Sequence, residues 1–424
     1  MNHPILSVSS QSLCCTPERR AFLAQRFGGH RGVDSRPRIC AWWAVAALLS
    51  FAIHGLAAHA APAPVASSEV PAPLRFCLAT LEHDHAWWTM DHIRETPGVE
   101  LVGVFDHQEH LREKARKRLT NSAPLFDDPE KMLKAVTPDA LIVTAPNNEH
   151  RALVELAARH RIHCLAQKPM ATTAADARAM QKAAAAAGIT LMVNYYPLWQ
   201  PARHELLTRA KAGEIGEVQQ MTVVNGMQGP KDMNVLTPDY RKWLYDPERN
   251  GGNVMGDQVT YGLDYVLWVM GCPESVVATI TPIKKHEEGI DDLATLTLSY
   301  PRGQATVIAS WAWPHPRGEL FCAGSRGSLT LRDKDIVRRN SPERFNLPVE
   351  EDVIQPSATI PPERKHGIAY FAHVLRNKLP VEQPHSAELN VVVCEVVDAA
   401  RESARTGRII KLKPSSSHQT RIRP

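Results

Sequence analysis

Between residues 74 and 195 the sequence alternates short apolar runs with helical patterns, and this alternation constrains the fold more than any other feature. Apolar runs bounded by turn residues are typical of buried strands. Five of them occur: "LRFCLAT", "VELVGVFD", "ALIVTAP", "HCLAQKP" and "ITLMVNY". Helical patterns lie between them, including 109–119, 129–135, 150–160 and 174–187. Strands joined by helical crossovers form parallel sheets, so the pattern predicts an α/β fold with a Rossmann-like, doubly wound parallel sheet.

From about residue 197 the pattern changes to strands in which apolar and polar residues alternate. Such runs include "VQQMTVVNGM", "SVVATITPI", "ATLTLSYP", "QATVIASWAW" and "GSLTLRD", and a last helical stretch covers 387–406. Period-two alternation is typical of antiparallel sheets with one face packed on a core. We therefore expect a first domain at 74–196 and a C-terminal α+β domain at 197–412, whose open sheet is mainly antiparallel. A linker at 61–73 precedes them, and a tail at 413–424 follows.

The first sixty residues carry the features of an export leader. Residues 39–58, "ICAWWAVAALLSFAIHGLAA", form a charge-free apolar run that follows several arginines and ends at a small-residue motif, Ala58-His59-Ala60. We expect cleavage there and a periplasmic protein. An uncleaved membrane anchor is the alternative, because the run is long enough to span a bilayer. "ERRAFLA", with Arg19 and Arg20, resembles a twin-arginine signal, so the twin-arginine and general secretory routes both stay open.

The charge distribution argues against a nucleic-acid binder. The net charge is +4, and six arginines against two acidic residues in the first sixty positions account for all of it. The rest of the chain is near neutral, without the basic stripe that phosphate neutralisation requires. The cysteines after the leader are an odd and scattered set, which favours buried free thiols over a disulfide framework or a zinc cluster. They are Cys77, Cys164, Cys272, Cys322 and Cys394.

The first strand is not followed by the glycine fingerprint of dinucleotide-binding folds. In G-x-G-x-x-G the glycines let backbone N–H groups approach a pyrophosphate closely. In "LATLEHDHAWW" those positions hold Ala79, Leu81 and Asp84. Three interpretations stay open: an adapted nucleotide loop, a metal or substrate role for His83 and His85, or a fold that has lost its nucleotide.

Asp106 ends the second strand, where a carboxylate can accept hydrogen bonds from both hydroxyls of an adenosine ribose. The same carboxylate would repel a 2'-phosphate, so this residue favours NAD over NADP. The alternative is an aspartate that merely caps the next helix.

An apolar helical pattern at 251–271, "GGNVMGDQVTYGLDYVLWVMG", carries two aspartates and a tyrosine between them. Asp257 and Tyr261 are four residues apart and so share one helix face, and Asp264 lies a further turn along. These side chains either line a cleft or satisfy hydrogen bonds in the core.

Two further motifs and this helix together resemble those of a known family. "DALIVTAPNNEH" followed by "HCLAQKPMA" is similar to the D-A-x-x-x-x-x-P-N-x-x-H and E-K-P signatures of the glucose-fructose oxidoreductase, inositol dehydrogenase and MocA (Gfo/Idh/MocA) family. Residues 251–271 are similar to its G-G-x-x-x-D-x-G-x-H-x-x-D helix. The resemblance runs from about residue 74 to 412. It implies an NAD(P)-dependent dehydrogenase or reductase of a sugar, cyclitol or related polyol, associated as a homo-oligomer.

Individual residues receive roles through this resemblance. Lys168 matches a lysine that contacts both the nicotinamide ribose and a substrate hydroxyl, and Asp257 and Tyr261 match the aspartate and the usual histidine of the helix motif. Val259 and Leu198 stand where a glycine and an arginine are usual. The other matches lie along the cofactor: Thr144, Pro146, Asn147, His150, Gln167 in place of a glutamate, and His83, which belongs to a first-turn histidine pattern found in part of the family.

We therefore expect an exported enzyme that acts on a CH–OH group of a sugar or polyol with NAD, or with NADP in its place. Lys168 and Tyr261 would transfer the proton, the lysine would lower the pKa of the tyrosine by charge proximity, and Asp257 would orient the substrate or the lysine. Two alternatives are a redox-neutral glycosidase or epimerase that uses bound NAD, and a sugar-binding protein without catalysis. No metal is expected, and contact with a membrane is expected only through an uncleaved N-terminal segment.

Overall fold

The computed structural model describes residues 72–120, 122–230, 236–284, 290–341, 347–356 and 359–412. The first sheet has six strands in the order β3-β2-β1-β4-β5-β6, and every neighbouring pair is parallel. This order confirms the predicted Rossmann-like doubly wound sheet. The strands are β1 (Leu74–Ala79), β2 (Val99–Phe105), β3 (Leu125–Phe126), β4 (Ala140–Val143), β5 (His163–Gln167) and β6 (Leu191–Asn194).

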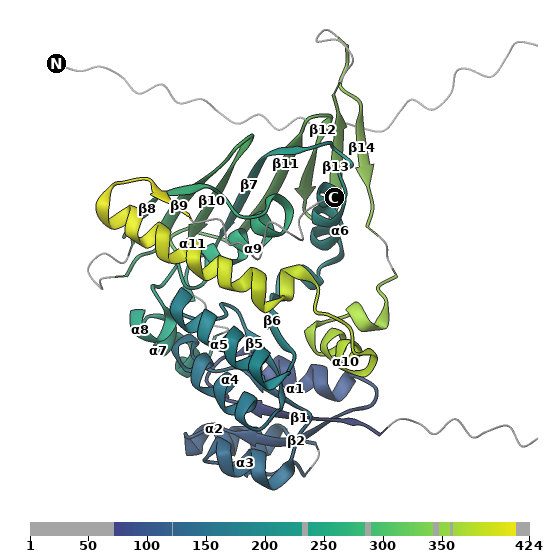
Figure 1. The fold of residues 1–424 in the computed structure, drawn as a ribbon, viewed down its shortest axis with the longest axis vertical. Coiled ribbons are helices and arrows are strands. Elements are labelled where there is room, and N and C mark those ends of the chain that lie inside the picture. Colours follow the sequence, from purple (N-terminus) through teal and green to yellow (C-terminus); the bar gives the residue numbers. More distant parts are fainter. Residues whose placement is uncertain are drawn as a thin grey trace, which may run out of the picture. The chain divides into compact units, whose positions relative to one another are not determined.

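Helices cover both faces of this sheet (Figure 1). Successive residues of a strand point to opposite faces, so Phe76 and Leu78 of β1 enter one core while Cys77 and Ala79 enter another. The first core includes α1 (His85–Glu95) and α2 (Glu109–Arg118). The second includes α3 (Pro129–Val136), α4 (His150–Arg159) and α5 (Ala174–Ala187).

Side-chain caps fix where two of these helices begin. Asp128 precedes α3, and its carboxylate accepts a hydrogen bond from a backbone N–H in the first turn. Thr173 does the same for α5, which ends at Gly188 in the left-handed conformation, with a φ of 67°. Because these signals are local, the helices predicted at 129–135 and 174–187 end within a residue of the observed ones.

The second sheet has nine strands in the order β14-β13-β12-β11-β7-β10-β9-β8-β15. Only the β7–β10 pair is parallel, so the sheet is mainly antiparallel, as predicted. The strands are β7 (Val218–Gly226), β8 (Ser275–Thr281), β9 (Leu293–Tyr300), β10 (Gly303–Ser310), β11 (Arg317–Gly324), β12 (Gly327–Arg332), β13 (Asp335–Asn340), β14 (Glu351–Ile354) and β15 (Ile410–Lys411).

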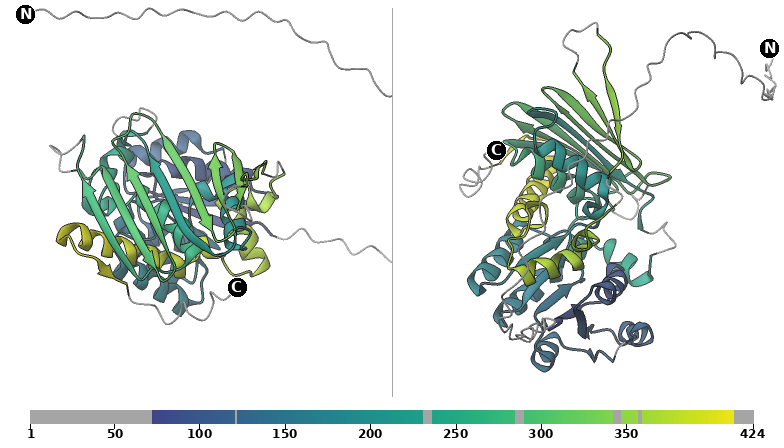
Figure 2. Two further views of the ribbon diagram at one scale, coloured as in Figure 1. Left: turned by 90° about the horizontal axis from the view of Figure 1, so that it is seen from above. Right: turned by 90° about the vertical axis from the view of Figure 1, so that its right-hand side faces the viewer.

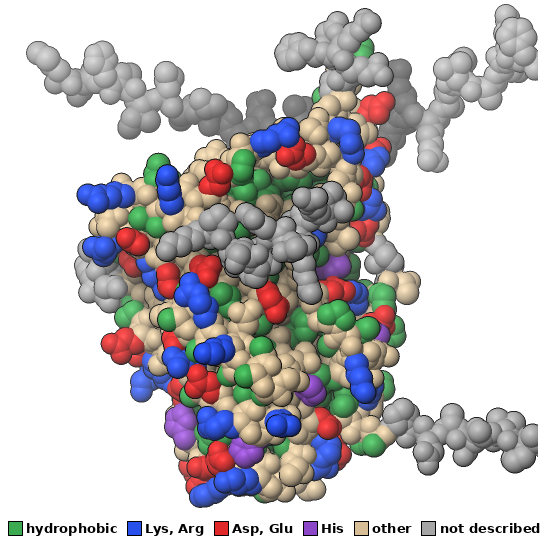
Figure 3. Space-filling model, in the orientation of Figure 1, with side chains coloured by type: hydrophobic (Ala, Val, Ile, Leu, Met, Phe, Trp, Pro, Cys, Tyr) green, Lys and Arg blue, Asp and Glu red, His purple; other side chains and the backbone are tan. Residues whose placement is uncertain are grey.

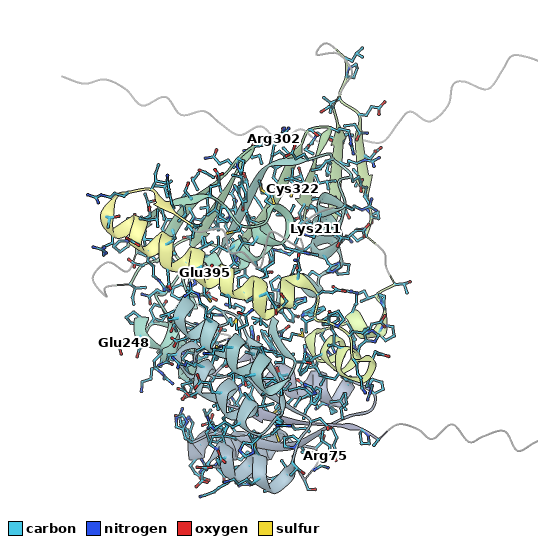
Figure 4. All side chains as sticks on the ribbon, in the orientation of Figure 1. Arg75, Lys211, Glu248, Arg302, Cys322 and Glu395 are labelled. Carbon is cyan, nitrogen blue, oxygen red and sulfur yellow. The ribbon has the colours of Figure 1, made fainter. Side chains whose placement is uncertain are left out.

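Helices pack on one face of the nine-stranded sheet. They are α6 (Pro201–Lys211), α9 (Gln258–Met270) and α11 (Ala387–Thr406). The other face carries no helix in the part of the chain that the structure describes (Figure 2). α11 also packs against α5 of the first sheet. Glu395, labelled on α11 in Figure 4, pairs there with Arg178 of α5 at 2.8 Å.

A late segment of the chain returns to the first sheet. Phe371 of α10 (Gly367–Asn377) packs 5.9 Å from Phe76 of β1, measured between ring centroids. His366, which caps α10, stacks on His92 of α1 at 4.0 Å. The residues around α10 therefore complete the core on the α1 face of the first sheet, although they follow strands β7 to β14 of the second sheet in sequence. The boundaries at 74–196 and 197–412 stay a prediction.

Residues 1–71 lie outside the described residues, and so do the expected leader, its membrane-anchor alternative and most of the linker. Within the described ranges, no helix is long and apolar enough to cross a bilayer. The five cysteines after the leader form no disulfide, and all except Cys272 are buried. On the face drawn in Figure 3, basic and acidic side chains are interspersed.

Candidate active site

The candidate site is built around an ion pair between Lys168 and Asp257. Lys168 follows β5 at the carboxyl edge of the parallel sheet, and Asp257 directly precedes α9. The two side chains are 4% and 7% exposed. The second carboxylate oxygen of Asp257 accepts hydrogen bonds from Gln258 Nε2 at 2.6 Å and from Trp311 Nε1 at 3.0 Å. The buried carboxylate is thus satisfied on both oxygens, which a buried charge requires.

The ion pair shifts the pKa of both partners toward their charged forms. Burial raises the pKa of Asp257, but the Lys168 ammonium and the two neutral donors outweigh it, so the pKa lies below its ordinary value. Burial lowers the pKa of Lys168, but Asp257 and Tyr261 outweigh it, so that pKa lies above its ordinary value. Lys168 is therefore an ammonium and Asp257 a carboxylate at neutral pH.

Tyr261 lies one helical turn beyond Asp257, and the ammonium of Lys168 stands 4.4 Å from the centroid of its ring. Burial raises the pKa of Tyr261, Lys168 lowers it and Asp257 raises it, and the net shift is upward. The expected lowering by Lys168 is therefore real but smaller than the effect of burial. Tyr261 is a protonated phenol at neutral pH, next to a fixed cation.

A glycine-rich turn sets the start of α9. Gly251 has a φ of 85°, a conformation that side chains rarely adopt, and a Cβ there would lie 2.9 Å from Thr172. A Cβ on Gly256 would lie 2.4 Å from the side-chain oxygen of Asn250. The close packing of this turn against the loop after β5 brings Asp257 to Lys168.

Asp264, the second aspartate of this stretch, does not share this site. It has no exposed surface, and neither of its oxygens has a hydrogen-bond partner among the described residues. Burial raises its pKa well above the ordinary value, so the carboxyl group is neutral. Asp264 lies near Tyr195 and Tyr265 in the core.

The segment after β4 contains four residues predicted to lie along the cofactor. The Thr144 hydroxyl donates to the Thr80 carbonyl at 2.5 Å and so connects β4 to the loop after β1. His150 Nε2 faces the Ala145 carbonyl at 3.0 Å, and its Nδ1 faces two carbonyls in the loop after β5. These two residues, like Pro146, are buried and position the surrounding loops. A contact between them and a cofactor stays a prediction.

Asn147 is the residue in this segment with an unused polar atom. Its Nδ2 donates to the Asn250 carbonyl at 2.7 Å, but its Oδ1 is buried and has no partner within the described chain. A buried acceptor without a partner costs free energy unless water or a ligand donates to it. The atom is suited to accept a hydrogen bond from a ribose hydroxyl or an amide.

The loop after β1 is packed by residues of the following domain. The ring of His83 stacks on Tyr240 of α7 (Pro238–Leu244) with centroids 4.4 Å apart, and its Nδ1 accepts the backbone N–H of His85. The Asp84 carboxylate accepts the backbone N–H and the hydroxyl of Thr237, at 2.8 and 2.6 Å. His83, predicted to bind the cofactor, lies under Tyr240 and is 1% exposed.

Gln167 links that loop to Lys168. Its Oε1 lies 3.1 Å from His85 Nδ1, which is consistent with a proton on Nδ1. Burial lowers the pKa of His85 to about 4, so the ring is neutral at physiological pH. Gln167, which replaces the usual glutamate, therefore accepts a hydrogen bond from the neutral His85 ring. A glutamate at this position would place a negative charge beside that ring.

Two buried acidic side chains, Asp106 and Glu82, lie where the adenosine ribose and the pyrophosphate are expected. Both oxygens of Asp106 accept backbone N–H groups, from Leu81 and Gln108, each at 2.7 Å, and the side chain has no exposed surface. In this structure Asp106 therefore holds the loop after β1. Glu82, 3% exposed, lies within the missing glycine fingerprint and pairs with Arg249 of α8 (Pro247–Asn250) at 2.8 Å.

The sequence analysis missed three of the residues that build this site. Trp311 directly follows β10, and its position at a strand end was the signal that could have found it. Arg249 had no sequence signal, because its partner Glu82 is 167 residues away. Leu198, which stands where an arginine was expected, is 1% exposed. Arg203 of α6 instead brings a guanidinium to this region and donates to the Tyr265 hydroxyl at 3.3 Å.

Comparison with known proteins agrees with this architecture. Residues 83–195 match the model of an oxidoreductase family with an NAD-binding Rossmann fold, and residues 205–330 match the model of the GFO/IDH/MocA C-terminal domain. A D-apiose dehydrogenase of Paraburkholderia graminis is 29% identical over 78% of this chain and 86% of its own length. A scyllo-inositol 2-dehydrogenase (NADP(+)) of Bacillus subtilis is 24% identical over 74% of this chain and 94% of its own.

Solved structures share the fold. An aldose-aldose oxidoreductase from Caulobacter crescentus superimposes with a TM-score of 0.67 at 19% identity, covering 80% of this chain and all of its own. A levoglucosan dehydrogenase in complex with NADH and levoglucosan gives a TM-score of 0.66 at 17% identity, over 81% of this chain and all of its own.

The fold and the lysine-centred site define a two-domain oxidoreductase with an NAD-binding Rossmann domain. Within that class the chain belongs to the Gfo/Idh/MocA family. Its departures from the family pattern lie in the glycine-free first loop, at Gln167 and at Tyr261.

Proposed function

We propose that this protein is an NAD-dependent dehydrogenase, with NADP as the alternative cofactor, which acts on a CH–OH group of a sugar or polyol. The observation that carries the proposal is the position of Lys168, a buried ammonium held between Asp257 and Tyr261. It lies at the carboxyl edge of a parallel sheet, where α/β folds bind their ligands. Membership of an NAD-binding oxidoreductase family supports the choice of cofactor.

Two polar groups of the candidate site fit the nicotinamide half of the dinucleotide. The Oδ1 of Asn147 offers an unused buried acceptor, and an ammonium has three N–H groups, of which Asp257 takes one. Where the pyrophosphate between the two halves is expected, Arg249 is a cation that it can engage, in competition with Glu82 and Glu149. Hydride transfer to and from carbon is the chemistry that a nicotinamide supplies when bound.

The chain's own residues hold the substrate and move a proton. The Lys168 ammonium donates to the substrate hydroxyl and stabilises negative charge as it develops on that oxygen. Tyr261, once deprotonated, accepts the hydroxyl proton during oxidation and returns it during reduction. Asp257 fixes the ammonium in place. Because the pKa of Tyr261 is raised, oxidation should accelerate as the pH rises above neutral.

The test is a turnover assay on the full chain. Sugars and polyols named for the relatives guide the panel: D-apiose, D-xylose, scyllo-inositol and levoglucosan. Each is mixed with NAD⁺ or NADP⁺, and the near-ultraviolet absorbance of the reduced cofactor is followed. We expect reduced cofactor to form with at least one compound. The rate of its formation should be at least about a hundredfold lower with Tyr261→Phe. Product formation with no net reduced cofactor would instead indicate the redox-neutral glycosidase or epimerase.

A sugar-binding protein without catalysis is the second candidate, and the acidic loop favours it. Glu82 is buried where a dinucleotide needs positive charge or bare backbone N–H groups. If the full chain binds a sugar of the panel while neither NAD nor NADP binds, this second candidate is correct and the dehydrogenase is not.

We also propose that residues 1–60 direct export and that the mature protein is a periplasmic homo-oligomer. The apolar run at 39–58 and the Ala58-His59-Ala60 motif support export. The helix-free face of the nine-stranded sheet supports self-association. Mass spectrometry of the periplasmic fraction and light scattering of the purified protein test the two statements. An intact N-terminus in the cytoplasm, or a monomer at micromolar concentration, would contradict them.

A further inference from the structure

Two aromatic side chains next to the candidate site are exposed to solvent. Trp88 of α1 is 46% exposed and Tyr196, the second residue after β6, is 43% exposed. In the part of the chain that the structure describes, no other Phe, Tyr or Trp side chain is as exposed. Although the two are 108 residues apart in sequence, their ring centroids lie only 5.9 Å apart.

Neither ring is needed for the core. α1 buries Trp87, Met90 and Ile93 on its packed side, which leaves Trp88 on the other side of the helix. After β6, Tyr195 is fully buried while Tyr196 turns outward. Exposed apolar surface is unfavourable by about 25 cal/mol for each Å². Clustered exposed aromatic rings therefore mark a binding surface more often than isolated ones do.

His85 connects the two rings to the catalytic lysine. Its ring stacks on Trp88 with centroids 5.0 Å apart and lies 6.4 Å from that of Tyr196. Its Nδ1 is 3.1 Å from Gln167 Oε1, and Gln167 directly precedes Lys168. The three rings, here called the aromatic platform, thus flank the site from the α1 side.

The chemistry of the platform fits an uncharged ring. Trp88 and Tyr196 carry no charge, and His85 is neutral at physiological pH, so the platform has no group that selects an anion or a cation by charge. Aromatic faces carry partial negative charge and attract the C–H edges of other rings. A pyranose presents several C–H groups on one face and hydroxyls around its rim, so it can stack while its hydroxyls stay hydrated.

We propose that the aromatic platform of His85, Trp88 and Tyr196 binds a second sugar ring, so that the preferred substrate is a disaccharide or other glycoside whose oxidised ring lies at Lys168. The inference rests on the proposed function, because the position of the reacting ring is taken from it. The platform then determines specificity, while Lys168 and Tyr261 carry out the chemistry.

Calorimetric titration of the full chain tests this proposal independently of turnover. The probes are matched pairs: cellobiose with D-glucose, xylobiose with D-xylose, and lactose with D-galactose. The wild-type protein should bind at least one disaccharide about tenfold more tightly than its monosaccharide. Trp88→Ala and Tyr196→Ala should each abolish that preference and leave monosaccharide and NAD affinity unchanged, while Trp88→Phe should keep it. Val353→Ala, an exposed residue of edge strand β14, is the control for loss of exposed apolar surface.

Three results would overturn the platform: a wild-type protein with no preference for disaccharides, a preference that survives both alanine variants, or variants that lose NAD affinity instead. The last result would mean that the rings hold the cofactor. Failure of the proposed function can be distinguished from failure of the platform. A protein that prefers disaccharides but transfers no hydride would support the platform and contradict only the proposed dehydrogenase activity.

Discussion

Lys168 and Asp257 form a buried ion pair that joins the carboxyl edge of the parallel sheet to the residue directly before α9. The pair links the two parts of the candidate site, because Lys168 lies on the Rossmann side and Tyr261 on the helix that Asp257 precedes. Each partner holds the other in its charged form. The predictions below test whether this contact organises the site.

Lys168→Met should abolish turnover and also destabilise the fold. The methionine leaves the Asp257 carboxylate buried without its cation, which is unfavourable by about 3 to 5 kcal/mol. Urea unfolding of the full chain measures the change. The double variant Lys168→Met, Asp257→Asn should recover most of the stability, because the buried charge is gone, while activity stays absent. A double variant no more stable than Lys168→Met would contradict the ion-pair account.

Tyr261→Phe should lower kcat by about a hundredfold to ten-thousandfold, with little change in stability. The phenylalanine ring keeps the packing under the Lys168 ammonium but has no hydroxyl to exchange a proton. Steady-state kinetics with the best sugar of the panel measures kcat and KM separately. If kcat of the variant lies within threefold of the wild-type value, Tyr261 does not transfer the proton.

Trp311→Phe should narrow the pH range of activity from the acid side. Its indole N–H donates to Asp257 at 3.0 Å, so removing it raises the pKa of that carboxyl and destabilises the protein by about 1 to 3 kcal/mol. The acid limb of the pH–rate profile should therefore move to higher pH. Trp87→Phe is the matched control, because the Trp87 N–H is buried and has no partner among the described residues. Equal shifts in both variants would rule out the indole hydrogen bond as the cause.

Glu82→Gln should tighten NAD binding, by about tenfold. The carboxylate lies in the first loop, where it both repels a pyrophosphate and engages Arg249. Its neutral isostere removes the repulsion and leaves the guanidinium paired with one carboxylate, Glu149, instead of two. Calorimetry measures the dissociation constant, with Glu95→Gln at the exposed far end of α1 as the control. Weaker NAD binding in Glu82→Gln would show that the glutamate supports the nucleotide loop.

Acid should destabilise the protein through His385, whose ring stacks on Trp199 with centroids 4.5 Å apart. Burial lowers the pKa of His385 to about 3. The unfolded chain takes up a proton near pH 6.5 and the folded chain does not. The contribution of His385 to the free energy of unfolding is therefore complete above pH 6.5, and it falls by about 1.4 kcal/mol per pH unit as the pH drops toward 3. Between pH 6.5 and pH 5, His385→Phe should lose about 2 kcal/mol less stability than wild type in urea unfolding. An equal loss of stability in the variant and the wild type would exclude His385 as a cause of the acid destabilisation.

Local signals in the sequence were enough to predict much of the fold. The elements that were not predicted lack such signals. Apolar runs and helix caps such as Thr173 and Gly188 depend on neighbouring residues, so the parallel sheet and α5 could be predicted. Strands β13 and β14 are short, and their sequences carry many charges, so their pairing depends on the rest of the sheet. The return of α10 to the first sheet depends on contacts such as Phe76 with Phe371, which no local pattern encodes.

The residues of the candidate site also divide into those that the sequence predicted and those that only the folded chain reveals. Lys168 and Asp257 were predicted as site residues, and the structure brings them into contact. The surroundings of Tyr261 were misjudged in one respect, because burial raises its pKa more than Lys168 lowers it, and burial is a property of the folded chain. Arg249 and Trp311 reach the site through long-range packing and could not be found from spacing alone.

The most direct test of the central claim is whether this chain, with no glycine in its first loop, binds NAD beside Lys168. The full-length protein is titrated with NAD⁺ and NADP⁺ by calorimetry, and a second sample is denatured to identify any nucleotide released. The account predicts one dinucleotide per chain, tighter binding of NAD⁺ than of NADP⁺, and weaker binding in Lys168→Met. Absence of bound nucleotide, together with no heat from either titration, would contradict it and leave a sugar-binding protein on a Rossmann scaffold.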